Sequence, residues 1–396
     1  MLRLSHYLRQ LHSAPNPQSA RKPPLINRDS PVVIWNLIRR CNLTCRHCYS
    51  TSTDTDFAGE LSTAEAHAVI DQLNEAGVRV LILSGGEPLL RPDVFELADH
   101  ARELGFYVAL STNGTLIDEA ILPRIAAAQF DYVGISLDGL RDTHTYMRRD
   151  PTAYDKSLEA VRLCRSAGIK VGLRTTLNQH NASELPAVLD LMHELDVQKF
   201  YLSHLNYSGR GKHHRKQDAH LRMTREAVDL LIQRAWSDIC HGLNTEYVTG
   251  NNDADAVRLL DWASQHRPDD YQRLHAMLTR WGGNATGSSI ANIDNLGEVH
   301  PDTYWWHYSV GNVRKRSFKD IWFDQPDVLL TELRRRPRPL GGRCGSCQWL
   351  EVCGGNTRTR AWATSGELWA EDPGCYLTDA EIGLTDKRIA AVPSAI

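Results

Sequence analysis

The chain has 396 residues, of which 42% are hydrophobic, and its formal net charge at pH 7 is -3. This length accommodates one large α/β domain and a smaller one. The near-neutral charge gives no electrostatic reason to expect binding to nucleic acid or an anionic membrane, and no apolar run reaches the length of a membrane span. The basic N-terminus lacks the apolar segment of a secretory signal. The nine cysteines are therefore expected in a reducing cytoplasm, as metal ligands and free thiols rather than disulfides.

Residues 1–30 predict an N-terminal arm in which an amphipathic helix precedes a proline-rich tether. The arm either packs against the rest of the protein or acts as a substrate lid that carries His6 or His12. A regular alternation of strands and helices begins at Pro31. Apolar runs indicate buried strands at residues 32–38, 78–84, 106–111, 132–137, 170–177 and 199–205.

A helix is expected after each of these strands. The first begins at a capping box formed by Ser62 and Glu65 and ends near Ala76, because Gly77 follows. The other predicted helices cover residues 93–104, 118–128, 154–167, 183–195 and 224–240. Six βα units with right-handed crossovers predict an α/β fold, and specifically a partial (β/α)6 TIM-like barrel over residues 31–245.

The rest of the chain is expected to form three smaller parts. Residues 246–285 make a bridging segment with a helix over residues 254–278. Residues 286–380 make a second domain that begins with a β-hairpin at residues 288–301. Residues 381–396 form a C-terminal tail.

Three cysteines, Cys41, Cys45 and Cys48, directly follow the first predicted strand in a C-x3-C-x2-C spacing. Three thiolates can ligate three irons of a cubane cluster and leave the fourth iron without a protein ligand, as in catalytic metal sites. The alternatives are a reactive thiol or a zinc knuckle with His47 as an additional ligand. Zinc sites usually need four ligands, so the spacing favours a [4Fe-4S] cluster.

Short polar motifs follow the next predicted strands: GGEP at residues 85–88, STNG at residues 111–114 and SLDG at residues 136–139. Together with the cysteines they resemble the radical S-adenosylmethionine (radical SAM) family over about residues 31–240. The resemblance implies that SAM is bound by Gly85, Gly86, Glu87, Pro88, Ser111, Thr112, Asn113, Ser136, Asp138 and Arg174. A guanidinium group such as that of Arg174 suits a carboxylate.

The resemblance also implies a reaction. In the family, the open iron binds the amino and carboxylate groups of SAM, and an electron from the cluster breaks a carbon–sulfur bond. The 5′-deoxyadenosyl radical that results takes a hydrogen atom from the substrate. The chain is therefore expected to be an oxidoreductase or lyase-type enzyme that needs an external low-potential electron donor of the flavodoxin or ferredoxin type.

A second cysteine group consists of Cys344, Cys347, Cys353 and Cys375. Four thiolates also suit zinc, so a structural zinc ribbon is the alternative. The surrounding sequence resembles the auxiliary-cluster (SPASM or twitch-like) domain of radical SAM enzymes, which implies a second, fully ligated [4Fe-4S] cluster that transfers electrons. Further cysteines of the longer form of that domain are replaced here by Gly287 and Asp302, so two clusters are expected in total. The remaining helical cysteines, Cys164 and Cys240, are expected to be buried thiols.

A basic loop at residues 208–220 follows the sixth predicted strand, on the face where barrel enzymes place their active sites. It is either a solvated loop or a clamp for a substrate with several carboxylates. The positions assigned to such a clamp are Arg210, Lys212 and Arg215, with Arg148 and Arg149 from the loop after the fourth strand. An aromatic run at residues 304–308 is either core or a platform for a flat ligand.

Three stretches narrow the resemblance to the tetrapyrrole-modifying branch of the family, which includes the heme d1 biosynthesis proteins. They are LRLSHYL near the N-terminus, GGNTRTRA at residues 354–361 and ELWAEDPGCYLTDAEI at residues 367–382. This resemblance implies action on 12,18-didecarboxysiroheme, with two propionate side chains removed or converted toward the oxo groups of heme d1. The alternatives are a tetrapyrrole decarboxylase of the alternative heme pathway, a peptide-modifying maturase, and a non-catalytic iron–sulfur carrier.

Overall fold

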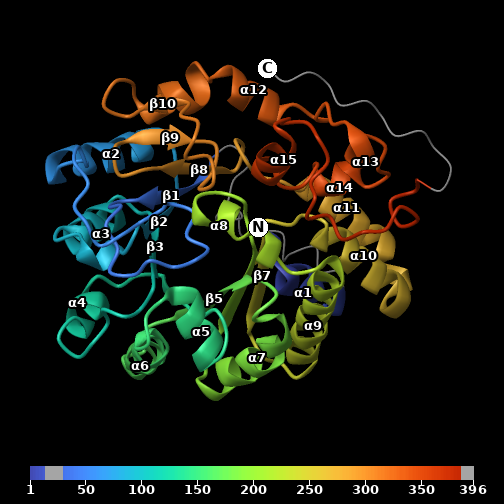
Figure 1. Cartoon of the computed structure of the whole chain (residues 1–396), viewed down its shortest axis with the longest axis horizontal. Coiled ribbons are helices and arrows are strands. Elements are labelled where there is room, and N and C mark those ends of the chain that lie inside the picture. The colour runs from blue at the N-terminus through green and yellow to red at the C-terminus, as the bar shows by residue number, and fades with distance from the viewer. Residues whose placement is uncertain (14–29, 385–396) are drawn as a thin grey trace.

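A ten-stranded sheet organises the protein in a computed structural model, which describes residues 1–13 and 30–384 (Figure 1). The predicted proline-rich tether and most of the predicted C-terminal tail lie outside the described residues. The strands are β1 (Val32–Asn36), β2 (Val80–Ser84), β3 (Tyr107–Thr112), β4 (Tyr132–Ser136), β5 (Val171–Leu177), β6 (Lys199–His204), β7 (Glu246–Gly250), β8 (Ile290–Ile293), β9 (Glu298–His300) and β10 (Gly311–Asn312). Their spatial order is β10-β9-β8-β1-β2-β3-β4-β5-β6-β7.

Helices surround the sheet, and Figure 1 shows α2, α3, α4, α6 and α7 around its outside. The helices of the first half of the chain are α1 (Leu4–His12), α2 (Thr63–Glu75), η2 (Pro88–Leu90), α3 (Val94–Glu103), α4 (Leu122–Ala127), α5 (Arg141–Arg148), α6 (Ala153–Ser166), η3 (Ala182–Glu184) and α7 (Leu185–Glu194). Those of the second half are α8 (Arg210–His213), η4 (Arg215–Gln217), α9 (Leu221–Cys240), α10 (Asp255–His266), η5 (Pro268–Asp270), α11 (Tyr271–Trp281), η6 (Asp320–Asp324), α12 (Val328–Arg334), α13 (Gly342–Gly345), α14 (Leu350–Cys353) and α15 (Arg358–Ser365). In the described part of the chain, no helix combines the length and apolarity that crossing a membrane requires.

Strands β1 to β7 are all parallel to their neighbours, which confirms the predicted α/β fold with a partial barrel. Their outward side chains join the helices in the main core, whereas an inner cluster that includes Val32, Ile82 and Tyr132 fills the concave side. The seventh strand was not predicted. Its five residues end in Gly250 and are too few for a period to stand out from the surrounding loops.

The C-terminal part of the chain continues the same sheet. The predicted hairpin is confirmed as β8 and β9, which are antiparallel. Strand β8 also pairs in parallel with β1, so it covers the edge that a six-stranded partial barrel would leave open. The amide of Asn292 strengthens this junction, because it donates to the side-chain oxygen of Asn36 at 2.7 Å and to the carbonyl of Ile34 at 2.6 Å. The division of the chain at residue 286 stays a prediction.

Two predictions about helices differ in outcome. The capping box at Ser62 and Glu65 is confirmed, with both reciprocal hydrogen bonds present. The single helix over residues 254–278 is wrong, because the chain forms α10 and α11 with the short η5 between them. Pro268 begins η5, and a proline has no backbone N–H to continue the hydrogen bonding of the preceding helix.

The N-terminal helix α1 packs against α9 and β7, as the packing-arm interpretation predicts. Leu4, Leu8 and Leu11 are buried, and the N–H of Leu2 donates to the carbonyl of Thr249 in β7 at 2.8 Å. The two histidines of the arm, His6 and His12, are exposed. The arm therefore acts as cover for the far edge of the sheet.

The last described residues are fastened to α9 by Glu381. Its carboxylate accepts hydrogen bonds from both terminal nitrogens of Arg225, at 2.8 Å and 2.6 Å, and from the backbone N–H of Thr378 at 2.7 Å. Hydrogen bonding by Arg225, followed by Thr378, lowers the pKa of Glu381 from 4.5 to about 2. The ionised carboxylate thus holds this segment over the second cysteine group.

We predict that Glu381→Gln destabilises the protein by about 1 kcal/mol or less at pH 7, since the pair is partly solvated. The pKa of this group is lower in the folded than in the unfolded state, so its contribution is complete above pH 4.5 and is lost as the pH falls toward 2. Denaturant unfolding at a series of pH values should show the gap to the wild type closing at acidic pH. The exposed Glu194→Gln serves as the control, and a gap that widens on acidification contradicts the prediction.

Candidate functional site

The loop that carries the first three cysteines lies directly against the turn that ends β2. The N–H of Gly86 donates to the carbonyl of Ile38 at 2.6 Å, and the N–H of Glu87 donates to the carbonyl of Arg40 at 2.9 Å. A Cβ atom at Gly86 would lie 2.2 Å from the Arg40 oxygen, and one at Gly85 would lie 2.6 Å from the Ile38 oxygen. The two glycines are therefore needed for the close approach of the cysteine loop. Their assignment to SAM binding stays a prediction.

The three cysteines of this loop are free thiols that lie within electrostatic reach of one another. Cys41 and Cys45 are buried, and Cys48 packs against them at the surface of the same small cluster. Burial raises the pKa of the Cys41 thiol, and the nearby charges of Glu87, Cys45 and Cys48 raise it further. A metal supplies the charge that keeps such thiols deprotonated, so this donor set fits an iron–sulfur cluster.

A buried ion pair contacts the loop that carries the first three cysteines. Asp138, at the end of β4, has no exposed surface, and its carboxylate lies 2.7 Å from a terminal nitrogen of Arg148 and 3.2 Å from Nε2 of His47. Arg148 also donates to the sulfur of Cys45 at 3.7 Å. Burial alone would raise the pKa of Asp138, but the positive charge of Arg148 keeps it below its usual value. The assigned clamp residue Arg148 is thus used inside the site, which corrects that prediction.

Two members of this network share one face of a helix. His144 and Arg148 are four residues apart on α5, so both face the end of β4. Nδ1 of His144 accepts the N–H of Asp138 at 2.9 Å, and burial lowers the pKa of His144 to about 3. Burial also lowers the pKa of His47 to about 4. Both imidazoles are neutral at pH 7, so Arg148 is the cation of this group.

The GGEP and STNG motifs are joined to each other through Glu87. Its carboxylate accepts hydrogen bonds from the hydroxyl of Thr112 at 2.7 Å and from the N–H of Asn113 at 2.8 Å. Burial raises the pKa of Glu87 to about 7, although these hydrogen bonds oppose the rise. Asn113 extends the connection, because its amide donates to the side chain of Asn42 at 2.9 Å and to the Cys41 sulfur at 3.8 Å. Glu87 therefore ties two strand ends to the cysteine loop.

Arg174 and its neighbours line the interior of the barrel. The guanidinium group donates to the hydroxyl of Ser111 at 2.7 Å and lies 5.1 Å from the ring centre of Tyr201. A hydroxyl and an aromatic ring leave the positive charge of the arginine without neutralisation, so the guanidinium group suits an anionic ligand.

Two further residues of the predicted SAM site take part in local structure. Ser136 lies on β4, between the strands that carry Ser111 and Arg174, and it donates to the carbonyl of Thr112 at 3.4 Å. Pro88 is buried at the first position of η2.

The basic loop after β6 is partly a support for the cysteine loop. The backbone N–H of Arg210 donates to the carbonyl of Cys48 at 2.9 Å, and its Nε donates to the carbonyl of Cys45 at 2.7 Å. Its terminal nitrogen donates to the carbonyl of Ser52 at 2.9 Å. A Cβ atom at Gly209 would lie 2.3 Å from the Tyr49 oxygen, so a glycine is required where the two loops meet. Arg210 therefore supports the cysteine loop through Nε and one terminal nitrogen, while its other terminal nitrogen has no hydrogen-bond partner. Its assignment to a substrate clamp stays a prediction.

The other assigned clamp residues remain at the surface. Arg149 is exposed and ends α5 with a left-handed backbone conformation, and Arg215 is exposed at the start of η4. Lys212 is exposed on α8, with its ammonium group 6.0 Å from the ring centre of Trp362. Trp362 in turn stacks on His307, with ring centres 4.2 Å apart. Lys212 therefore belongs to a small aromatic and cationic surface beside the cysteine loop.

The predicted aromatic run divides between core and site. Trp305 is buried in a core cluster of the C-terminal part. Tyr304 and Trp306 instead lie near Tyr49, with ring centres 5.4 Å and 6.5 Å from it. The hydroxyl of Tyr49 accepts a hydrogen bond from Asn36 at 2.9 Å. The core interpretation therefore holds for Trp305, whereas the platform for a flat ligand stays a prediction. Tyr49 links the first cysteine loop to the aromatic run.

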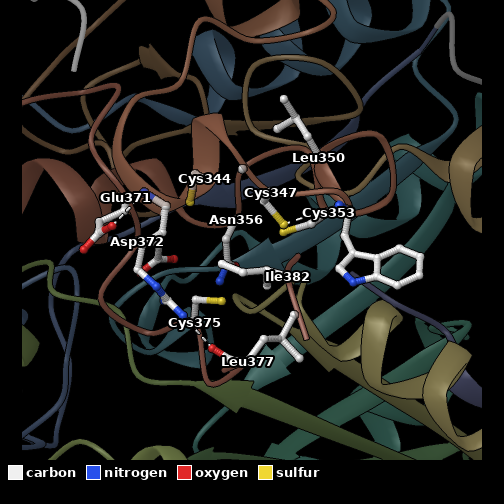
Figure 2. A pocket seen from close by; sticks show the side chains of 13 residues that line it. Cys344, Cys347, Leu350, Cys353, Asn356, Glu371, Asp372, Cys375, Leu377 and Ile382 are labelled. Atoms are coloured by element: carbon white, nitrogen blue, oxygen red, sulfur yellow. Dashed lines mark hydrogen bonds between the residues drawn. The ribbon is translucent and has the colours of Figure 1, made fainter. Parts of the chain in front are cut away.

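The second cysteine group lines one cavity in the C-terminal part, shown in Figure 2 with the four sulfurs around a common space. The cysteines come from α13, from α14, from the loop between these helices and from the segment after α15: Cys344, Cys353, Cys347 and Cys375. Burial raises the pKa of Cys353, and the charges of Asp253 and of the three other cysteines raise it further. Burial also raises the pKa of Cys375 to about 12. Four convergent thiols fit a fully ligated cluster.

Among residues 1–13 and 30–384, no group of three or more His, Cys, Asp or Glu side chains is arranged around a single metal ion. A cubane cluster has four irons at separate corners, so its cysteine ligands stand further apart than the ligands of one ion.

Gly287 and Asp302 occupy the positions where the longer form of the domain has further cysteines, and both make hydrogen bonds within the protein. The N–H of Gly287 donates to the carbonyl of Pro301 at 2.9 Å, and Asp302 accepts hydrogen bonds from Thr286 and Tyr304.

The two remaining cysteines differ from each other. Cys164 is buried in the main core, as expected. Cys240 is exposed, which corrects the prediction of a second buried thiol. It is the last residue of α9, and the buried face of that helix ends at Asp238 and Ile239.

Comparisons with known proteins agree with this geometry. The chain matches the radical SAM superfamily over residues 35–192. It is 52% identical to pre-heme d1 synthase of Dinoroseobacter shibae, over 97% of this chain and 94% of that protein. It is 43% identical to Fe-coproporphyrin III synthase of Methanosarcina barkeri, over 89% of each chain. Its fold is similar to that of Streptococcus suis SuiB bound to precursor peptide SuiA, with a TM-score of 0.68 and 17% identity over 88% of this chain and 76% of that one.

We predict that Gly86→Ala prevents the cysteine loop from seating against β2, because the added methyl group would overlap the Arg40 carbonyl. After anaerobic reconstitution, the variant should hold about four irons fewer per chain than the wild type, the content of one cubane cluster. Gly77→Ala is the matched control, since its Cβ would meet nothing within 4 Å and only its backbone conformation is strained. Full iron content in Gly86→Ala would contradict the steric argument.

Proposed function

The chain belongs to the radical SAM superfamily, and we propose that this enzyme acts in heme d1 biosynthesis with 12,18-didecarboxysiroheme as its substrate. The proposed reaction removes or converts two propionate side chains toward the oxo groups of heme d1. The observation that carries the proposal is the 52% identity with pre-heme d1 synthase over nearly the full length of both chains. The two cysteine groups support it, because side-chain oxidation by hydrogen abstraction needs a site that starts the reaction and a site that accepts an electron.

In this proposal, Cys41, Cys45 and Cys48 hold a [4Fe-4S] cluster whose fourth iron binds SAM. A reduced cluster and SAM together supply the 5′-deoxyadenosyl radical, which is the hydrogen-abstracting reagent of the family. Arg174 lies where it can pair with a carboxylate, since its present partners leave its charge available. Glu87 and Asp138 act indirectly, because their carboxylates are occupied by neighbouring residues and hold the loop in place.

The second cysteine group is proposed to hold a fully ligated [4Fe-4S] cluster. Its four thiols come from different turns of the C-terminal part and face one cavity. A cluster without an open iron cannot bind substrate directly, so we assign it the role of electron acceptor. The electron that reduces the first cluster comes from an external donor of the flavodoxin or ferredoxin type.

A flat, acidic macrocycle suits the surface beside the cysteine loop. Trp362 and His307 provide stacked rings, and Lys212 provides a cation close to them. Trp362 is 38% exposed, so part of its ring remains accessible to a ligand although His307 stacks on it. Arg149 and Arg215 are further exposed cations that could pair with carboxylates of the substrate.

A second candidate function is supported by the 43% identity with Fe-coproporphyrin III synthase. In that case the same radical chemistry would produce Fe-coproporphyrin III from a tetrapyrrole precursor. A peptide-modifying role has weaker support, because the likeness to SuiB at 17% identity concerns the fold. The mass of the product separates all three possibilities.

We predict that reduced, anaerobic protein converts SAM to 5′-deoxyadenosine only when didecarboxysiroheme is present. Chromatography of the reaction should show 5′-deoxyadenosine and a tetrapyrrole that has lost or exchanged two propionate side chains. Formation of Fe-coproporphyrin III would favour the second candidate function. An unchanged tetrapyrrole under strict anaerobiosis would reject both tetrapyrrole reactions.

Cysteine variants test the two proposed clusters separately. Cys41→Ala and Cys344→Ala should each lose about four irons per chain, and the double variant should lose both sets. Cys41→Ala should form no 5′-deoxyadenosine, whereas Cys344→Ala should still cleave SAM but leave the substrate unfinished. Cys240→Ala is the matched control, because its thiol is exposed at the end of α9. Loss of iron from only one variant would contradict the assignment of two clusters.

A further inference from the structure

A buried ion pair joins the second cysteine group to the barrel. Arg360 of α15 is 1% exposed and Asp372 is fully buried. Nε of Arg360 lies 2.8 Å from one carboxylate oxygen of Asp372, and its terminal nitrogen lies 2.8 Å from the other. This is the two-pronged geometry in which a guanidinium group holds a carboxylate most firmly. A buried ion pair is costly to desolvate, so we expect it to have a role other than stabilising the fold.

Asp372 organises the second cysteine group on one side of the pair. Its carboxylate also accepts the N–H of Thr357 at 2.9 Å and the N–H of Gly374 at 2.8 Å. Its carbonyl accepts the N–H of Cys375 at 3.1 Å, and its own backbone hydrogen-bonds the sulfur of Cys344. One residue therefore sets the position of two of the four cysteines (Figure 2).

Arg360 holds the barrel on the other side of the pair. Its second terminal nitrogen donates to the carbonyl of Leu205 at 3.1 Å, directly after β6. A Cβ atom at Gly374 would lie 2.5 Å from the guanidinium carbon, so the chain next to Cys375 is closed tightly over this side chain. The neighbouring Thr359 donates to the side chain of Asn206 at 3.0 Å. The pair thus reaches the strand end through two adjacent contacts.

The segment that Arg360 holds is the segment that supports the first cysteine loop. Asn206 packs on Gly211, where a Cβ atom would lie 2.5 Å from the Asn206 carbonyl. Arg210, one residue before, donates to the carbonyls of Cys45 and Cys48. Residues 205–211 therefore contact the first cysteine loop at one end and the Arg360–Asp372 pair at the other.

We propose that the Arg360–Asp372 pair is a positioning element that couples the two cysteine groups through residues 205–211. The pair fixes the second group at one distance and orientation from the first, which an electron passing from a substrate radical formed at the first group to the second group requires. Its charges also act on the second cluster, since a buried cation favours the more negative reduced state and a buried anion disfavours it. The inference rests on the proposed second cluster for the electronic effect alone.

Two measurements on the reconstituted full chain test the coupling. In Arg360→Met, amide hydrogen exchange over residues 205–211 and over the first cysteine loop should become about tenfold faster or more, because breaking a buried pair leaves a charge unpaired. The midpoint potential of the second cluster, followed by electron paramagnetic resonance, should fall in Arg360→Met and rise in Asp372→Asn. Shifts of opposite sign would not follow from a loss of packing alone.

Two further variants keep the result interpretable. Arg360→Lys retains the charge without the two-pronged geometry, so it should speed the exchange while moving the potential less than Arg360→Met. Asp229→Asn is the matched control, because it breaks a similar two-pronged pair with Arg258 between α9 and α10. It should leave residues 205–211 and the potential unchanged.

Three other results would each contradict one part of the proposal. Unchanged exchange over residues 205–211 in Arg360→Met and Arg360→Lys would overturn the coupling and reduce the pair to a local support. Potentials that move in the same direction in Arg360→Met and Asp372→Asn would overturn its electronic role. If the wild-type second group binds no iron, the proposed second cluster fails, while the exchange comparison still decides whether the link exists.

Discussion

The contact between the first cysteine loop and the turn after β2 is the constraint on which the rest of the site depends. Two backbone hydrogen bonds draw Ile38 and Arg40 onto Gly86 and Glu87, at separations that leave no room for a side chain. The loop has no secondary structure of its own, so its shape is imposed by its neighbours. Glycines at the strand end are what allow the loop that carries the three cysteines to approach so closely.

Charged side chains also help to hold the first cysteine loop in place. Asp138 would be costly to bury alone, and Arg148 compensates for it while also touching the sulfur of Cys45. Arg210 contributes a second cation, whose guanidinium group donates to the carbonyls of Cys45 and Ser52. Cations next to a thiolate-rich loop reduce the repulsion among its sulfurs. These arginines therefore lower the electrostatic free energy of holding the three cysteines close together.

The C-terminal part extends this architecture. Strand β8 pairs with β1, and so the hairpin begins beside the strand that leads into the first cysteine loop. Tyr304 and Trp306 then approach Tyr49 from the same side. The two cysteine groups are therefore parts of one continuous structure, joined along one edge by the sheet and near the end of β6 by the segment around Leu205.

The sequence by itself determined the fold class, the first helix cap and the grouping of the cysteines, because these depend on local period and spacing. Apolar runs mark β1 to β6, and the C-x3-C-x2-C spacing already confines Cys41, Cys45 and Cys48 to one short loop. Only the tertiary structure decided how individual charges are used. Arg148 and Arg210 look like free surface cations in the sequence, yet their partners Asp138 and Cys45 are about 10 and more than 100 residues away along the chain. Such pairings arise when strand ends meet at one edge of a sheet, and no periodic pattern in the sequence encodes them.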